Sequence, residues 1–241
     1  MRLAGALLLG LTISTGCGWT REPPTRSIEV GTGARSLVLL HGFSSSPQEW
    51  MPFTATIRLP AGRRFVFPEG PDAGVNGRGR AWWALDLASH VGSDGLPDLS
   101  ATRPEGLEPA ARSVRALLRD YRRRDGDGGR DVVLGGFSQG AMVSAEIAFR
   151  SDERLQALVL LSPTIVDEPS WRDGIAARTG LPVFIAHGRT DRILPFGASS
   201  RLARTLADAG LKVTWVPFDG GHEIPAEVVT ALNAFLETHA R

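Results

Sequence analysis

The sequence predicts one α/β domain with a mainly parallel sheet and helices on both of its faces. Short apolar runs, typical of strands buried on both sides, alternate along the chain with segments of helical periodicity. Parallel strands joined in this way need right-handed crossovers, which place helices over both faces of the sheet. The length of 241 residues fits one such domain and is short for two. We therefore expect a single domain over residues 34–241.

Six apolar runs are predicted to form the strands, and the segments between them are predicted to be mostly helical. The expected strands are residues 36–40, 64–68, 131–136, 155–161, 182–186 and 212–218. The expected helices are residues 47–57, 105–124, 141–149, 170–178, 199–209 and 226–240. Residues 28–30 suit a short edge strand, and the Gly-, Pro- and Asp-rich stretch 69–104 suits a long loop.

The N-terminus has the features of an export signal. A positive start precedes an apolar run of eleven residues, Leu3–Ile13, which is too short to span a bilayer. Residues 1–16 with Cys17 resemble a bacterial lipoprotein signal, in which the cysteine is lipidated and becomes the new N-terminus. Ser14 departs from that pattern, which favours Leu, Val or Ile at its position. Cleavage by an ordinary signal peptidase, giving a secreted or periplasmic soluble protein, and a buried N-terminal helix are the alternatives.

The resemblance to a lipoprotein signal implies a protein of the bacterial cell envelope that is anchored to a membrane through lipid on Cys17. This residue is the only cysteine of the chain, so it forms no internal disulfide. Residues 17–33 are rich in Pro, Thr, Arg and Gly and are expected to form a tether. The formal net charge of +1 falls to about zero without Arg2, which argues against nucleic acid as a partner.

The stretch Gly136-Phe137-Ser138-Gln139-Gly140 is a G-x-S-x-G pentapeptide between a predicted strand and a predicted helix. This context is that of a nucleophile elbow, a strained turn that holds a serine hydroxyl out toward a base. Glycine two residues on either side keeps Cβ atoms away from the neighbouring elements. We predict Ser138 as the nucleophile; an ordinary serine in a strand–helix loop is the alternative.

The partners of Ser138 should follow it in the order acid, then histidine, at the carboxyl ends of strands. His222 stands in a glycine-rich loop directly after a strand and is the predicted base, whereas His187 precedes the best acid and His239 lies on the last helix. Asp191 is the predicted acid. Asp219 competes, but an acid three residues before the base on one loop is badly placed to reach the far ring nitrogen.

Backbone N–H groups are expected to stabilise the oxyanion of the reaction. The N–H of Gln139, directly after the nucleophile, is one predicted donor. The other should come from the loop after the first core strand, where we predict Phe43, with Ser44 in reserve. His41 is expected to hold that loop and not to take part in the reaction.

Four segments together resemble the phospholipase/carboxylesterase family of α/β-hydrolases, which includes acyl-protein thioesterases. They are Leu40–Phe43, Gly136–Gly140, His187–Pro195 and Gly220–Ile224. The resemblance spans about residues 36–236 and implies an α/β-hydrolase fold without a separate lid domain, a triad of Ser138, Asp191 and His222, and oxyanion donors at Phe43 and Gln139. The family usually has leucine at the Phe43 position and a shorter loop in place of Gly70–Pro104.

Trp82 and Trp83 lie in that loop, where family members carry a tryptophan-containing segment near the acyl pocket. We interpret them as an apolar wall of the substrate site, with core packing of the two indoles as the alternative.

These features predict a serine carboxylesterase that needs no metal or organic cofactor and acts on a small-molecule or lipid ester. A lysophospholipase, a thioesterase and a polyester-type esterase are alternative enzymes. From another class, a catalytically dead, lipid-tethered binding module would share the fold. The sequence predicts neither the acyl chain length nor the leaving group nor the oligomeric state.

Overall fold

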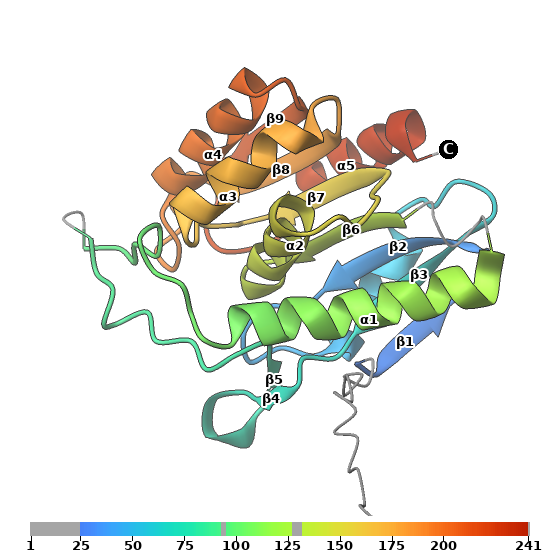
Figure 1. Ribbon diagram of the computed structural model, residues 1–241, viewed down its shortest axis with the longest axis horizontal. Helices are drawn as coiled ribbons and strands as arrows, with labels where there is room; N and C mark the ends of the chain where they lie inside the picture. Colours follow the sequence, from blue (N-terminus) through green and yellow to red (C-terminus); the bar gives the residue numbers. More distant parts are fainter. Residues whose placement is uncertain (1–24, 93–94, 127–131, 241) are drawn as a thin grey trace, which may run out of the picture.

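A computed structural model describes residues 25–92, 95–126 and 132–240 (Figure 1). The predicted signal peptide, Cys17 and the first part of the predicted tether lie outside the described residues. Of the helices that the structure describes, none is both long and apolar enough to cross a membrane.

The described chain is organised around a seven-stranded sheet in the order β1-β3-β2-β6-β7-β8-β9. Six of these strands run parallel to one another, and β1 pairs antiparallel with β3 at one edge. Their bounds are β1 Ser27–Val30, β2 Arg35–Leu40, β3 Arg63–Pro68, β6 Val132–Phe137, β7 Ala157–Leu161, β8 Pro182–Gly188 and β9 Lys212–Phe218. A separate two-stranded hairpin, β4 Asp72–Ala73 with β5 Arg80–Ala81, lies within the long loop after β3. The predicted fold class, parallel strands and edge strand are confirmed.

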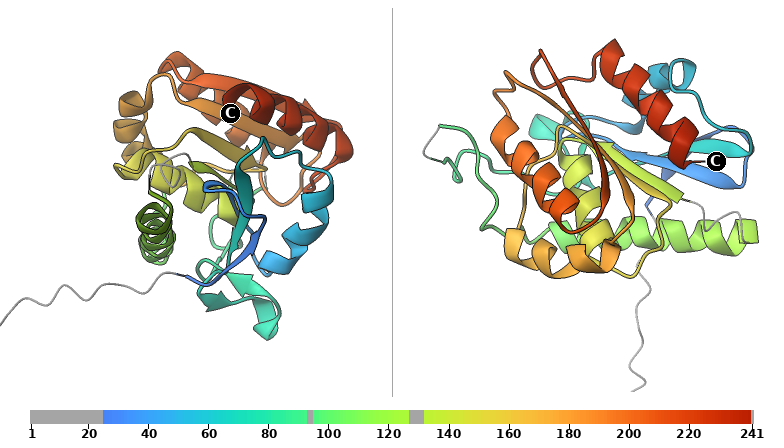
Figure 2. Two further views of the ribbon diagram at one scale, coloured as in Figure 1. Left: turned by 90° about the vertical axis from the view of Figure 1, so that its right-hand side faces the viewer. Right: turned by 90° about the horizontal axis from the view of Figure 1, so that it is seen from above.

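Helices cover both faces of the sheet, and the right-hand view of Figure 2 shows the two layers on either side of it. One layer contains α1 Leu107–Asp125, α2 Gln139–Arg150, α3 Glu168–Ile175 and α4 Phe196–Asp208. The other contains η1 Pro47–Ala55 and α5 Ala226–His239. The described residues also form the 3₁₀ turns η2 Val75–Gly77 and η4 Ala176–Arg178.

One predicted helix differs from the structure. Residues 47–57 form no α-helix; they form the 3₁₀ helix η1, which ends at Ala55. Pro52 lies inside it and has no N–H to donate to an i−4 carbonyl, which disfavours the α-helical ladder at this point.

The continuous apolar runs arise because alternate residues of each strand enter different cores. In β2, Val38 and Leu40 pack with the α1–α4 layer, whereas Leu37 and Leu39 pack with η1 and α5. All four side chains are fully buried. A strand covered on both faces must be apolar at every position, and this is the pattern that made the strands recognisable.

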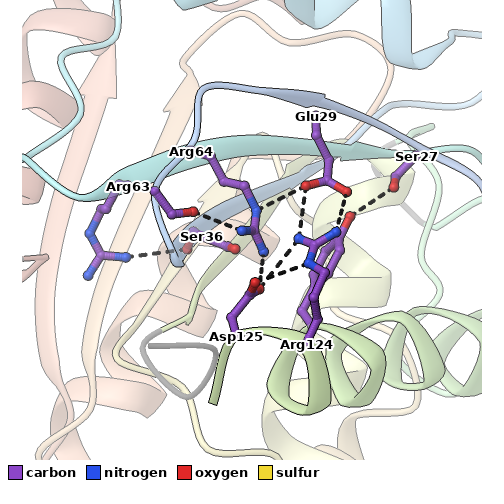
Figure 3. A network of polar contacts seen from close by, with 9 residues as sticks. Ser27, Glu29, Ser36, Arg63, Arg64, Arg124 and Asp125 are labelled. Atoms are coloured by element: carbon purple, nitrogen blue, oxygen red, sulfur yellow. Dashed lines mark hydrogen bonds and ion pairs between the residues drawn. The ribbon is translucent and has the colours of Figure 1, made fainter. Parts of the chain in front are cut away.

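A network of polar contacts fastens the edge strand to the end of α1 (Figure 3). The guanidinium of Arg64, on β3, contacts Glu29 of β1 at 3.2 Å and Asp125 of α1 at 2.5 Å. Arg124 donates two hydrogen bonds of 3.0 Å to Glu29. The ring of Tyr121 lies within 4.7 Å of both guanidinium carbons, and its hydroxyl is 2.9 Å from Ser27 Oγ. The charges of the network compensate one another and pin the sheet edge to α1.

Candidate active site

Ser138 lies in the turn between β6 and α2 with a strained backbone. Its φ of 55° and ψ of −117° belong to a region that a residue with a Cβ rarely adopts. The turn is held by neighbouring backbone groups: the Ser138 N–H donates to Leu161 O at 2.8 Å, and the Ser138 carbonyl accepts from Ala141 N at 3.0 Å. The strain therefore persists because the end of β7 and the first turn of α2 fix the backbone on both sides.

Both glycines of the pentapeptide are required by close backbone packing. A Cβ on Gly136 would come within 2.5 Å of the carbonyl carbon of Gly140. A Cβ on Gly140 would come within 2.3 Å of the Leu40 carbonyl oxygen. Neither neighbour is a flexible side chain that could move away. Glycine is thus required at both positions because β6, α2 and the end of β2 pack too closely there to admit a Cβ.

Asp191 and His222 are in direct contact: the distance from His222 Nδ1 to Asp191 Oδ2 is 2.6 Å. The other carboxylate oxygen, Oδ1, accepts the N–H groups of Ile193 at 2.8 Å and Leu194 at 3.0 Å. His187 Nε2 lies 3.1 Å from Oδ2. Although burial by itself raises the pKa of Asp191, the hydrogen bonds from His187, His222 and the Leu194 N–H hold it well below its usual range. Asp191 is therefore a buried, ionised acceptor.

The competing acid, Asp219, faces away from the site. Its side chain is 95% exposed and lies 3.4 Å from Arg189. The geometry thus assigns the contact with His222 to Asp191 alone of the two.

The loop that carries His222 is fixed against the turn that carries Asp191. The Thr190 N–H donates to Gly220 O at 3.0 Å, and the Arg189 N–H donates to Phe218 O at 2.9 Å. A Cβ on Gly188 would come within 2.2 Å of the Gly221 carbonyl oxygen. The glycines after His187 and before His222 therefore permit two loops, distant in sequence, to approach closely enough for the acid to reach the base.

The ring of His222 lies beside the elbow. Its centroid is 4.7 Å from that of Phe137, the residue before Ser138. A Ser138–His222 hydrogen bond is not among the contacts of the described residues. Such bonds are often long in unliganded enzymes and tighten when substrate is bound.

The two predicted oxyanion donors lie on segments that meet at Ser138. Gln139 begins α2, so its N–H has no acceptor within the helix. A Cβ on Gly42 would lie 3.6 Å from the Ser138 Cβ, which places the chain just before Phe43 against Ser138. Ser44, at φ 57°, accepts the Val75 N–H on its hydroxyl at 2.8 Å and so fixes the loop.

His41 and the side chain of Gln139 hold the long loop after β3 in place. His41 Nε2 accepts the Gly70 N–H at 3.0 Å, and the His41 carbonyl accepts the Trp82 indole N–H at 2.9 Å. Burial lowers the pKa of His41, in keeping with a neutral ring that accepts on Nε2. The Gln139 amide bonds to the backbone of Trp82 and Trp83, each at 2.9 Å.

The two tryptophans of this loop are buried, with 1% of Trp82 and 3% of Trp83 exposed. Trp82 stacks on His41 with ring centroids 5.2 Å apart, and both indoles belong to the core on the α1–α4 side. Burial of both indoles in the core agrees with the alternative that these tryptophans serve core packing. Their interpretation as a wall of the substrate site stays a prediction.

A cavity of about 190 Å³ opens beside His222. Its lining is mostly apolar and aromatic and includes two carboxylates: His41, Gly42, Ser45, Glu49, Trp50, Phe53, Phe137, His222, Glu223 and Ile224. A concave apolar site next to a polar catalytic group is the usual form of a small-molecule site.

Comparison with known proteins identifies the family to which this chain belongs. The chain matches the phospholipase/carboxylesterase family over residues 31–240. It belongs to that family. Membership makes the chain an α/β-hydrolase of the esterase and thioesterase class.

Individual members of the phospholipase/carboxylesterase family are distant in sequence but similar over most of their length. Acyl-protein thioesterase 1 of Yarrowia lipolytica is 25% identical over 235 residues, which cover 91% of this chain and 99% of that protein. The putative hydrolase MhqD of Bacillus subtilis is 25% identical, with 81% and 89% covered. The crystal structure of esterase PE8 superposes with a TM-score of 0.75 at 27% identity, covering 90% of this chain and 98% of that one.

Three features of this member of the phospholipase/carboxylesterase family could not be read from the sequence. They are the Gln139 amide bridge to the tryptophan loop, the packing of Phe137 on His222 and the contact of His187 with Asp191. Each joins side chains from segments distant in sequence. Only the glycine spacing in the two loops signals that these segments meet.

Proposed function

We propose that this protein is a carboxylesterase that hydrolyses carboxylic esters through an acyl-enzyme on Ser138. The observation that carries the proposal is the 2.6 Å contact of Asp191 with His222, whose ring lies beside the strained elbow of Ser138. Asp191 holds the imidazole with Nδ1 protonated, which leaves Nε2 free to accept a proton.

The reaction then proceeds in two halves. His222 takes the Ser138 proton as the hydroxyl attacks the ester carbonyl, and the N–H groups of Phe43 and Gln139 stabilise the oxyanion. His222 returns the proton to the leaving alcohol, and the acyl group stays on Ser138. A water molecule activated by the same histidine releases the acid and restores the serine. Apart from the substrate and this water molecule, every group in these steps belongs to the chain.

The cavity beside His222 favours esters with a short substituent on that side of the site. A volume of about 190 Å³ is below the roughly 300–1,000 Å³ of pockets that hold drug-sized ligands, so the cavity suits a small group. A palmitoyl chain would extend beyond it. Glu49 and Glu223 in its lining also disfavour an anionic group such as a phosphate.

Hydrolysis of p-nitrophenyl esters from acetyl to palmitoyl, run beside Ser138→Ala, tests the proposal. We expect rates that depend on Ser138 and peak at short chains. The variant should keep the wild-type circular dichroism spectrum and lose labelling by a fluorophosphonate probe. Activity near the wild-type level in Ser138→Ala would reject the assignment, and a protein that neither turns over any ester nor reacts with the probe would support the binding module.

A second candidate activity is acyl thioester hydrolysis, which the name of the Yarrowia lipolytica relative favours. The same triad serves both reactions, because the acyl-enzyme is identical. A matched pair of one acyl group as p-nitrophenyl ester and as coenzyme A thioester separates them by kcat/KM. A peak at long chains in the ester series would instead favour a lysophospholipase.

We also propose that the protein is a membrane-anchored lipoprotein of the bacterial cell envelope. The support is the signal-like sequence of residues 1–16 followed by Cys17. Fractionation of cells that express the wild type and Cys17→Ser tests it. Lipid-anchored protein should be found with the membranes and the variant should not. If the wild type and Cys17→Ser are distributed equally between membrane and soluble fractions, the alternative of a soluble secreted or periplasmic protein is favoured.

A further inference from the structure

His187 is a buried histidine for which the proposed reaction has no step, and its surroundings fix its protons. It ends β8 with no exposed surface. Its Nδ1 lies 2.7 Å from Ser199 Oγ, on α4. That hydroxyl donates its single proton to the Pro163 carbonyl oxygen at 2.6 Å, because a carbonyl can only accept. Ser199 Oγ therefore accepts from His187, and Nδ1 carries a proton.

The second ring nitrogen also faces only acceptors. Nε2 lies 3.1 Å from Asp191 Oδ2 and 3.2 Å from the Leu194 carbonyl oxygen. Neither oxygen has a proton to give, since Asp191 is held ionised by its own donors. A lone pair on Nε2 would point at a carboxylate and a carbonyl at a position with no exposed surface, which is strongly unfavourable. A proton on Nε2 satisfies both.

We propose that His187 is an imidazolium ion that neutralises the Asp191 carboxylate and keeps His222 in its neutral, base-competent form, and is thus a positioning residue of the triad. Both histidines contact the same oxygen, Asp191 Oδ2, so His187 and His222 are neighbours on one carboxylate.

Few other charges surround His187 within the described residues. Phe196 of α4 lies edge-on to its ring with centroids 6.1 Å apart. The guanidinium of Arg189 lies over Phe196 and pairs with the exposed Asp219. The charge that faces the imidazolium is therefore that of Asp191, and the titratable group beyond it is His222.

The consequence for catalysis is electrostatic. A cation next to a second basic group disfavours protonation of that group, so the charge of His187 opposes protonation of His222. Without the cation, the uncompensated charge of Asp191 would favour the protonated form of His222. His187 therefore extends the working range of the site toward acid. This part of the inference rests on the proposed function, whereas the charge of His187 does not.

The charge is measured on the intact wild-type protein by long-range ¹H–¹⁵N correlation of its histidine rings at neutral pH, with no ester present. The chain has five histidines, and the signals lost in His187→Gln identify the residue. We expect both His187 nitrogens at the shifts of a protonated ring. One nitrogen at the shift of an unprotonated ring would overturn the proposal whether or not the protein hydrolyses esters.

The effect on catalysis is measured as the pH dependence of kcat/KM. His187→Gln keeps a donor toward Asp191 and removes the charge, so we expect the acidic limb to move up by about one pH unit. His239→Gln, at the far end of α5, should leave the limb in place. A purely structural His187 would lower activity or thermal stability in the variant without moving the limb. Ser199→Ala is a second variant with the same expected direction, because loss of its acceptor oxygen removes the need for the second proton.

Discussion

The side-chain oxygen of Gln139 accepts a hydrogen bond of 2.9 Å from the backbone N–H of Trp82, a residue 57 positions earlier in the chain. The amide nitrogen of Gln139 donates to Trp83 O at the same distance. Gln139 is itself fully buried. The residue that follows Ser138 thus fastens the long loop after β3 to the elbow through its side chain, and its backbone N–H is the proposed oxyanion donor.

Gln139→Ala should therefore destabilise the protein by about 3 kcal/mol, because a buried N–H and a buried carbonyl lose their partner and a cavity remains. The measurement is the midpoint of chemical denaturation. Gln48→Ala, at an exposed position of η1, is the matched control and should change stability by less than about 0.5 kcal/mol. Equal effects of the two substitutions would show that the amide bridge contributes nothing to stability.

Gly140→Ala should destabilise the elbow by roughly 1–3 kcal/mol and reduce ester hydrolysis, since the added methyl group meets the Leu40 carbonyl at 2.3 Å. Gly197→Ala is the opposite case. Gly197 lies in α4, is exposed and has nothing within 4 Å of an added Cβ, so alanine should stabilise the helix by roughly 0.5–1 kcal/mol. Thermal denaturation of both variants checks the pair, and loss of stability in Gly197→Ala would contradict the geometry.

Most of the fold could be predicted from the sequence because each strand buried on both faces appears there as a continuous apolar run. Leu37 to Leu40 alternate between two cores, and the resulting apolar run is visible without the structure. The proposed triad was accessible for a similar reason. Ser138, Asp191 and His222 each follow a strand of the parallel sheet, and such positions meet at one edge.

Contacts between side chains of distant segments produce no comparable pattern in the sequence. The proton count at His187 depends on where the Ser199 hydroxyl donates, which is a property of the packed structure. The Gln139 bridge likewise depends on the path of a loop more than fifty residues away. The 3₁₀ form of η1 was foreseeable from Pro52, because proline inside a helix has a local and known effect.

Tyr121 is the only tyrosine of the chain, so its ionisation can be followed alone by ultraviolet absorption. Burial raises the pKa of Tyr121 from 10.0 to about 12. We expect a tyrosinate step with a midpoint near 12 in the folded protein and near 10 in denaturant. Tyr121→Phe should show no step. A midpoint of 10 in the folded protein would mean that the ring is solvated.

The same shift makes a contribution to stability that depends on pH. A folded-state pKa above the unfolded value means that the neutral phenol is favoured by folding. The contribution is fully present below pH 10 and is lost as the pH rises through about 12. The stability of the wild type should therefore fall between about pH 10 and 12 relative to that of Tyr121→Phe, which has no phenol to titrate.

Asp191→Asn and Asp219→Asn form a matched pair that tests which acid serves His222. Asparagine at 191 keeps the volume and removes the charge that orients and stabilises the protonated base. We expect kcat to fall by roughly 10⁴-fold, as the loss of a triad carboxylate does in serine proteases. Asp219 is 95% exposed and distant from this role, so its variant should keep near wild-type kinetics.

The pH dependence of stability distinguishes a charged Asp191 from a neutral one. Because its folded-state pKa lies below the usual value, the stability that it contributes is present above about pH 4 and is lost as the pH falls toward the folded value. Asp191→Asn lacks this contribution. The difference in unfolding free energy between wild type and Asp191→Asn should thus be greatest near neutral pH and shrink in acid, whereas Asp219→Asn should follow the wild type throughout. A difference that stays constant down to strong acid would show that Asp191 acts through its shape alone and that the four donors around it do not hold a charge.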